Sequence, residues 1–293
     1  MGNSIDYAKK FVPVIDGIYK AASVTQGMDA ATQVDFTGVN EVKVLKVSTT
    51  GLGDYSRANG YPKGDVTATW ETLKLTEERG KEISIDRMDN EETLGLTFGT
   101  VTGNFMREQV IPELDAYRFA KYASTTGIST TTAAVLTKDD ILAAIDEAVR
   151  KLNADEVPLE GRRLYINSDL QPVLNSALSR QWGSDSSVNT VLAGYNGMPI
   201  TWVPPTRFYT AITLNDGSTN WGYTKASGAA DINFMIVYPG AILQVQKFAL
   251  PKIFSPDINQ DKDAWKFQFR LYHDALVYDN KVKGIYLHKK TVS

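Results

Sequence analysis

The sequence predicts an α+β protein, and two observations carry that prediction. Alternating, β-branched segments gather in residues 41–86 and again from Met198 to the C-terminus, a pattern typical of strands. Between them, apolar residues recur at helical spacing from Glu91 to Ser124, which indicates one unusually long helix. Helices and strands thus occupy largely separate parts of the chain, as in mixed α+β folds.

Composition excludes several classes of protein. The chain of 293 residues is 43% hydrophobic and 22% charged, as in ordinary globular proteins. Its net charge of −3 argues against a basic nucleic-acid binder. It has no cysteine, which rules out disulfides and thiolate chemistry. No apolar run approaches the ~20 residues of a membrane span, so we expect no membrane partner and folding in the cytoplasm.

The first elements in chain order are an arm and a hairpin. Residues 1–40 hold one short apolar stretch among small, polar residues and predict an arm with a short helix. Residues 41–86 contain the strand-like segments EVKVLKV, VTATWETLKLT and EISID. A stretch rich in glycine separates the first two, which predicts an extended hairpin with a flexible tip. A strand pair from Glu41 to Asp86 would reach about 50 Å at ~3.3 Å per residue.

The long helix is predicted to begin near Asp89, because Asp89 and Glu92 form a capping-box pattern. At ~1.5 Å per residue it would form a rod of roughly 50 Å. Pro112 lies inside it and should kink or restart it.

Later elements are shorter. Thr137 and Asp140 open a second helix after a Thr-rich linker, and GRRLYINSDLQPVLNSAL predicts a strand, a cap at Ser168 and a helix. Short strands fill residues 198–248, and the C-terminal segment WKFQFRLYHDALVYDNKVKGIYLHKK predicts two strands in a sheet.

A search for chemistry finds no catalytic constellation. His273 and His288 have no HExxH partner, and we expect both on strand surfaces. The loop DINQDKD begins like a calcium loop, but Lys262 replaces the required glycine and Gln268 the bidentate glutamate, so a solvated acidic loop is the better interpretation. GLGDYS lacks the third glycine of a dinucleotide loop. We therefore expect no enzyme, no cofactor and no metal.

The stretches KEISIDRMDNEETLGL, YNGMPITWVPPTRF and LYHDALVYDNKVKGIYLHKK resemble parts of the major capsid (coat) protein of tailed bacteriophages, which has the Hong Kong 97-like fold. KEISIDRMDNEETLGL running into FMREQVIPELDAYRFAKYA is similar to the family's passage from extended loop to spine helix. YNGMPITWVPPTRF resembles a strand and turn of its axial domain, and LYHDALVYDNKVKGIYLHKK resembles its closing peripheral-domain strands.

The resemblance implies a shell subunit with four parts. These are an N-terminal arm (1–40), an extended hairpin loop (41–90), a peripheral domain with the spine helix (91–159 and 246–293) and an axial domain (160–245). Many relatives carry an N-terminal scaffolding domain that is cleaved off. Here the arm begins close to Met1, so either scaffolding is a separate protein or none is used.

The function implied is self-assembly into hexamers and pentamers that form an icosahedral head around phage DNA. The implied partners are further copies of the chain, a portal, a separate scaffolding protein and packaged double-stranded DNA in non-specific contact. The implied location is the virion, with assembly in the host cytoplasm. Two alternatives stay open: an encapsulin-like bacterial cargo compartment with the same fold, and an enzyme or carbohydrate-binding module.

The hairpin is the predicted contact between subunits. A lone two-stranded ribbon is marginally stable in water, and large aromatic side chains commonly anchor interfaces. A neighbouring subunit that supports the hairpin explains both, whereas a hairpin folded back on its own domain is the alternative. Some relatives join loop and peripheral domain by a lysine–asparagine bond, but no spacing supports the pair Lys63 and Asn280, so we expect a non-covalent shell. The candidate contact residues are Tyr55, Arg57, Tyr61, Lys63 and Trp70.

Overall fold

The computed structural model describes residues 23–28, 41–58, 60–61, 63–92, 96–178 and 194–291. Most of the predicted arm, residues 1–40, lies outside these ranges. The described part of it is a short segment that ends in a single 3-10 turn, η1 (Gln26–Met28).

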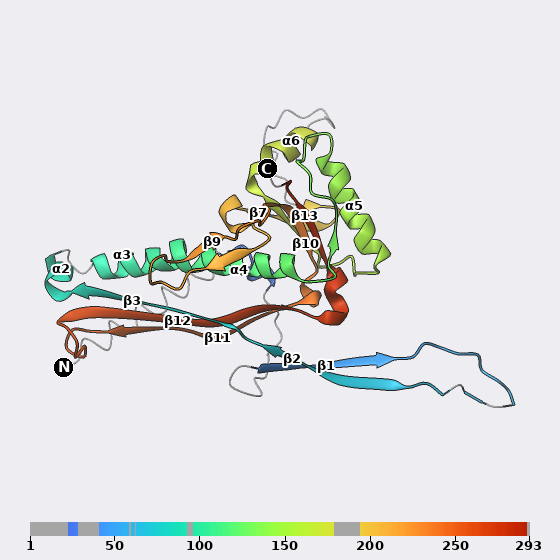
Figure 1. Cartoon of the computed structure of the whole chain (residues 1–293), viewed down its shortest axis with the longest axis horizontal. Coiled ribbons are helices and arrows are strands. Elements are labelled where there is room, and N and C mark those ends of the chain that lie inside the picture. Colours follow the sequence, from blue (N-terminus) through green and yellow to red (C-terminus); the bar gives the residue numbers. More distant parts are fainter. Residues whose placement is uncertain are drawn as a thin grey trace.

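A long helix forms the spine of the molecule (Figure 1). It runs without interruption through α3 (Leu96–Phe105), the π-helical turn η2 (Met106–Val110) and α4 (Ile111–Ser124). Pro112 was predicted to kink or restart the helix; the helix instead continues through it, with a local change of helix type just before the proline. Proline lacks an N–H and its ring collides with the carbonyl four residues back, and the wider π turn lies directly before it. There the Ile111 N–H donates to the carbonyl of Met106, five residues back.

The spine begins differently from the prediction. A separate short helix, α2 (Arg87–Glu92), comes first, and residues 93–95 lie outside the described ranges. The Asp86 carboxylate accepts a hydrogen bond from the Met88 N–H at 2.9 Å. Asp86 therefore caps this helix, and the predicted cap at Asp89 is wrong because Asp89 lies inside the first turn.

A three-stranded antiparallel sheet lies along the spine helix (Figure 1). Its strands are β11 (Ile242–Phe254), β12 (Ala264–Val277) and β3 (Glu77–Asp86), in the order β11-β12-β3. Helix and sheet share one apolar cluster. It contains Met106, Val110, Ile111 and Leu114 from the helix and Phe267, Phe269 and Leu271 from β12.

A six-stranded mixed sheet forms the second unit, with the order β4-β13-β10-β5-β7-β6. Alternate residues of its central strands enter two different clusters, as the two-residue period of a strand requires. Leu164, Ile166, Phe234 and Ile236 face α5 and α6, whereas Tyr165, Met235 and Val237 face the other side. Both faces are thus covered. The elements are β4 (Ser129–Thr130), α5 (Ile141–Ala154), β5 (Arg163–Asn167), α6 (Gln171–Leu178), β6 (Gly194–Tyr195), β7 (Met198–Val203), β10 (Ile232–Val237) and β13 (Ile285–Lys289).

Helix α4 joins the two units. Its first turn packs on β12, and Tyr117, Phe119 and Tyr122 enter the cluster beneath the six-stranded sheet. All residues from Leu114 to Ala120 are buried, as expected for a helix enclosed on every side.

Two predictions for the second unit are corrected. The two C-terminal strands do not share a sheet, because β12 pairs with β11 and β3 whereas β13 pairs with β10 and β4. The turn before α6 is capped by Asn167, whose side chain accepts from the Asp169 N–H at 3.0 Å, and not by Ser168.

The hairpin projects away from both units (Figure 1). Strand β1 (Glu41–Thr49) pairs in antiparallel register with β2 (Val66–Lys74). The predicted strand pair is confirmed but is shorter than expected, because residues 77–86 belong to the three-stranded sheet. Nine residue pairs at ~3.3 Å each span roughly 30 Å, and the loop 50–65 extends beyond them. A second, smaller hairpin of β8 (Ile212–Leu214) and β9 (Tyr223–Lys225) lies against the spine helix (Figure 1).

Candidate assembly interface

The long hairpin has two chemically different faces. Residues paired across an antiparallel ribbon point to the same side, so the register assigns every side chain to a face. Leu45 pairs with Trp70, Val47 with Ala68 and Thr49 with Val66, and these six form what we call the apolar face. The opposite face carries Lys46, Ser48, Thr67 and Thr69 along the same length.

The apolar face is exposed to solvent. Trp70 is 64% exposed, Val66 69% and Val47 56%. Among the described residues, seven of the thirteen exposed large hydrophobic side chains belong to this hairpin. They are Leu45, Val47, Leu52, Tyr55, Tyr61, Val66 and Trp70. Contiguous exposed apolar surface of this kind marks interaction sites.

The tip brings two of the predicted contact residues together. Tyr55 and Tyr61 meet edge to face, with ring centroids 5.0 Å apart. Between them the backbone of Ser56 and Gly60 closes a turn through two hydrogen bonds of 3.2 and 2.7 Å, and Gly60 takes the positive φ of +77° that this turn requires. Two aromatic rings are therefore presented at the end of the ribbon.

The other predicted contact residues are separated from this pair. Arg57 and Lys63 are exposed beside the tip. Trp70 lies on the apolar face, opposite Leu45. The sequence prediction missed Leu45, Val47, Leu52 and Val66, although strand alternation from Trp70 was a signal that could have found Val66 on the same strand.

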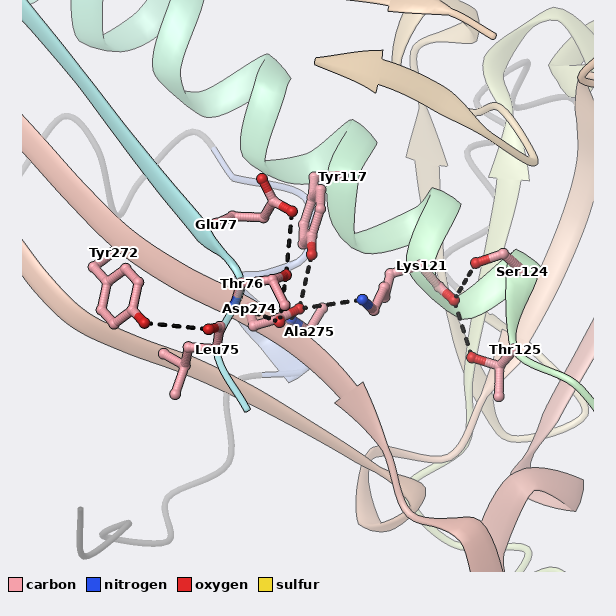
Figure 2. Close-up of polar contacts among 10 residues, drawn as sticks. All are labelled: Leu75, Thr76, Glu77, Tyr117, Lys121, Ser124, Thr125, Tyr272, Asp274 and Ala275. Atoms are coloured by element: carbon pink, nitrogen blue, oxygen red, sulfur yellow. Dashed lines mark hydrogen bonds and ion pairs between the residues drawn. The ribbon is translucent and has the colours of Figure 1, made fainter. Parts of the chain in front are cut away.

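The root of the hairpin is fixed by a buried carboxylate (Figure 2). Leu75 and Thr76 connect β2 to β3, and Asp274 of β12, which is 1% exposed, accepts two hydrogen bonds from Thr76. The Thr76 N–H and hydroxyl reach Asp274 Oδ2 at 3.1 and 3.0 Å. The connection between the hairpin and the body is thus held by two hydrogen bonds to one buried carboxylate.

The spine helix completes this anchor from the other side. The Tyr117 hydroxyl donates to Asp274 Oδ1 at 2.8 Å, and Lys121 Nζ lies 3.7 Å from the same oxygen (Figure 2). Burial, with the nearby Asp274 charge, raises the pKa of Tyr117 well above its usual range, so this phenol stays a donor. Helix, sheet and hairpin root therefore meet at one carboxylate.

Apolar contacts and an ion pair add to the anchor. Leu75 is 4% exposed and packs with Leu243, Val245, Tyr272 and Leu276, and the Tyr272 hydroxyl donates to its carbonyl at 3.2 Å (Figure 2). On the polar face, Lys46 Nζ lies 2.8 Å from Asp279 and 3.0 Å from Glu71. The polar face thus rests on its own subunit near the root, whereas Leu45, Val47, Val66 and Trp70 on the apolar face are all exposed.

The structure corrects the prediction for both histidines. His273 is 2% exposed and His288 3%, so neither lies on a strand surface. The His273 ring stands edge-on to Tyr117, with centroids 5.1 Å apart, and burial, reinforced by Arg118 and Arg79, lowers its pKa to about 3. His288 stacks on Phe234 and contacts the Asn233 amide at 3.1 Å. Both are packed core residues.

A cavity of about 350 Å³ lies between the spine helix, β3 and the loop after β8. Arg79 on its wall donates to Glu113 at 2.7 and 3.1 Å and to the carbonyls of Asn215 and Gly222 at 2.6 and 3.2 Å. This arginine fastens the small hairpin to the spine. Lys81 Nζ lies 3.4 Å from the ring centre of Trp221. The charged side chains that line the cavity therefore bind other groups of the same chain and stabilise the fold.

The acidic loop pairs with cations of its own chain. Asp257 and Asp263 lie 3.7 and 3.8 Å from Arg87, and Asp261 pairs with Lys266. In the described ranges no group of three or more metal-ligating side chains converges. No helix within those ranges is long and apolar enough to cross a membrane.

An elongated body with a projecting hairpin (Figure 1), fixed at its root and exposing apolar side chains, is the architecture of a subunit built to join further subunits. The sequence profile of the phage capsid protein family matches residues 71–286. The chain therefore belongs to the phage capsid protein family. It is a structural subunit of the virion shell and not an enzyme, and it assembles into the hexamers and pentamers of that shell.

Solved structures from two phages and of a virus-like particle have a similar fold. The capsid of the cyanophage P-SCSP1u superposes with a TM-score of 0.65 at 13% identity, covering 90% of this chain and 88% of that one. The structure from the Gordonia phage Cozz superposes with a TM-score of 0.62 at 14% identity, covering 92% of this chain and 87% of that one. The structure of a virus-like particle from Pyrococcus furiosus superposes with a TM-score of 0.57 at 12% identity, covering 96% of this chain and 99% of that one. At these identities the likeness shows the fold, and the family match favours the phage head over the cargo compartment. No curated protein sequence matches the chain significantly.

Proposed function

We propose that the hairpin is the assembly element of this capsid protein, and that a neighbouring copy buries its apolar face. The observation that carries the proposal is the concentration of exposed apolar side chains on one face of a ribbon whose root is fixed. A free ribbon gains little stability from such residues, whereas an interface buries them at a gain of ~25 cal/mol per Å².

Adjacent residues on opposite faces offer a matched test. Val47→Glu places a charge on the apolar face, and Ser48→Glu places the same charge one residue along on the polar face. We expect the first change to abolish shells and the second to leave them intact, as seen by electron microscopy and size-exclusion chromatography. Shells of normal size and yield from Val47→Glu would contradict the proposal.

The same proposal divides the chain into parts. We assign the spine helix and the three-stranded sheet to the peripheral domain, and the six-stranded sheet with α5 and α6 to the axial domain. We assign β13, a strand of the six-stranded sheet, and α5, which packs on that sheet, to the axial unit and not to the predicted peripheral ranges 91–159 and 246–293. We retain 1–40 as the arm, although residues 23–28 pack on the body, and we shorten the hairpin to 41–74.

Further partners belong to the proposal as well. We propose assembly in the host cytoplasm with a portal and a separate scaffolding protein, and loose contact with packaged double-stranded DNA. A net charge of −3 suits a wall along which DNA slides, since strong DNA affinity rests on clustered cations. Gel-shift assays of free subunits at physiological salt should show no sequence-specific binding, and a sub-micromolar specific complex would contradict this part.

A further inference from the structure

A second buried carboxylate lies on the spine helix and holds a different chain segment from the hairpin root. Asp115 of α4 is fully buried, with an exposed fraction of 0%. Its partners come from residues 23–25, ninety positions earlier in the chain. Oδ1 accepts from the hydroxyls of Ser23 and Thr25, both at 2.7 Å, and from the Thr25 N–H at 3.3 Å. Oδ2 accepts from the Val24 N–H at 3.2 Å.

Two arginines tighten this arrangement. Arg207 Nη1 donates to Asp115 Oδ2 at 3.2 Å, and it belongs to the 3-10 turn η4 (Pro205–Arg207) next to the six-stranded sheet. Arg118, one helical turn after Asp115, donates to the Thr25 hydroxyl at 2.6 Å. The Thr25 hydroxyl thus accepts from an arginine and donates to the carboxylate. One buried anion therefore holds the early segment, the spine helix and η4 together.

Apolar packing fixes the same segment independently. Met28 is 1% exposed and lies in the main core with Tyr117 and Phe119 of the spine helix. Val24 packs against that cluster. The Arg163 guanidinium lies directly against Gly27, beside the position where a Cβ would stand. The residues from Ser23 to Met28 are accordingly part of the folded body.

We propose that Asp115 is a positioning residue that fixes residues 23–28 on the spine helix and thereby sets the position of Ser23, to which residues 1–22 are joined. An exposed aspartate would bind this segment weakly. A buried one without these donors would be an unsatisfied charge, which folded proteins avoid. The segment and the carboxylate therefore depend on each other. The inference concerns the folded subunit and does not depend on what the hairpin binds.

Hydrogen exchange measured by mass spectrometry on the full chain tests it. Asp115→Ala should speed exchange of the peptide spanning residues 23–28 at least tenfold, and Asp115→Asn, which keeps one acceptor oxygen, should have an intermediate effect. Glu113→Gln is the control, because Glu113 lies two residues away on the same helix but binds Arg79. It should leave that peptide unchanged.

A second variant keeps the test decisive if Asp115→Ala does not fold. Thr25→Val removes the hydroxyl that bridges Asp115 and Arg118 without altering the helix, and it should also speed exchange of this peptide severalfold. In a double-mutant cycle the two changes should be non-additive, since they remove the same contact. Exchange within twofold of the unmodified chain in both Asp115→Asn and Thr25→Val would overturn the proposal, as would additive effects.

Discussion

Trp70→Ala should weaken assembly strongly while leaving the subunit folded. Trp70 stands on the apolar face opposite Leu45 and is 64% exposed. A tryptophan offers roughly 200 Å² of burial, so about 130 Å² remains for a neighbour to cover. At ~25 cal/mol per Å² this amounts to about 3 kcal/mol per contact, or roughly a hundredfold in the association constant.

The assay is the lowest protein concentration at which shells form, followed by light scattering and checked by electron microscopy. Trp70→Ala should raise this concentration by about two orders of magnitude, and Trp70→Phe, which keeps most of the apolar area, should restore much of the loss. Thr69→Ala on the opposite face serves as the control. A threshold within twofold of the unmodified protein for Trp70→Ala would refute the reasoning, because it would mean that the exposed indole stays in water after assembly.

Three further predictions follow from the anchor, the buried histidine and the shell contacts, the first two measured on subunits kept unassembled by Val47→Glu. Asp274→Ala leaves the buried Thr76 and Tyr117 donors without an acceptor, at roughly 1–3 kcal/mol each, and should lower the free energy of unfolding by about 3–5 kcal/mol in total; an unchanged denaturant midpoint would contradict the anchor. Burial lowers the pKa of His273 from 6.5 to about 3, so between these pH values the unfolded chain binds more protons than the folded one. The free energy of unfolding therefore falls as the pH falls below about 6.5, and at pH 5 the loss is about 2 kcal/mol. His273→Phe should remove that loss between pH 7 and pH 5, and an unchanged pH dependence would argue against a neutral, buried ring. Mature heads boiled in detergent should give a single band at subunit mass, and a ladder of covalent oligomers would show cross-linking.

The elements that the sequence predicted best are those with a strong hydrophobic period or with glycine and proline residues that mark turns and helix irregularities. The helix through Ile111–Ser124 and the strand pair around the glycine-rich tip were both foreseen, because a 3.6-residue or two-residue period is a local property of the chain. A local effect of Pro112 was foreseen for the same reason, since a missing N–H acts locally, although the helix continues through it.

Sheet membership was not predictable in this way. Strand β13 pairs with β10, about fifty residues earlier, and nothing in its own sequence distinguishes that partner from β12. The burial of His273 was missed for a related reason, because the face on which it lies is covered by α4, an element from another part of the chain.

Asp115 and Asp274 were missed although a signal was present. Asp115 lies in LDA and Asp274 in HDAL, and each is a carboxylate next to apolar residues inside a largely buried element. A carboxylate buried in that position needs hydrogen-bond or ionic partners, because burying it without them costs free energy. Asp115 found them in residues 23–25 and Asp274 found them at the hairpin root, and such distant partners cannot be read from local sequence.

Electron microscopy of a hairpin deletion tests the central claim most directly. Residues 50–64, which include Tyr55 and Tyr61, would be replaced by a two-residue turn, which leaves Leu75, Thr76 and the Asp274 anchor in place. The account predicts a folded subunit whose melting behaviour is nearly unchanged and a field without shells, beside abundant icosahedral particles from the unmodified chain. Particles of normal size and stability from the deletion variant would contradict it.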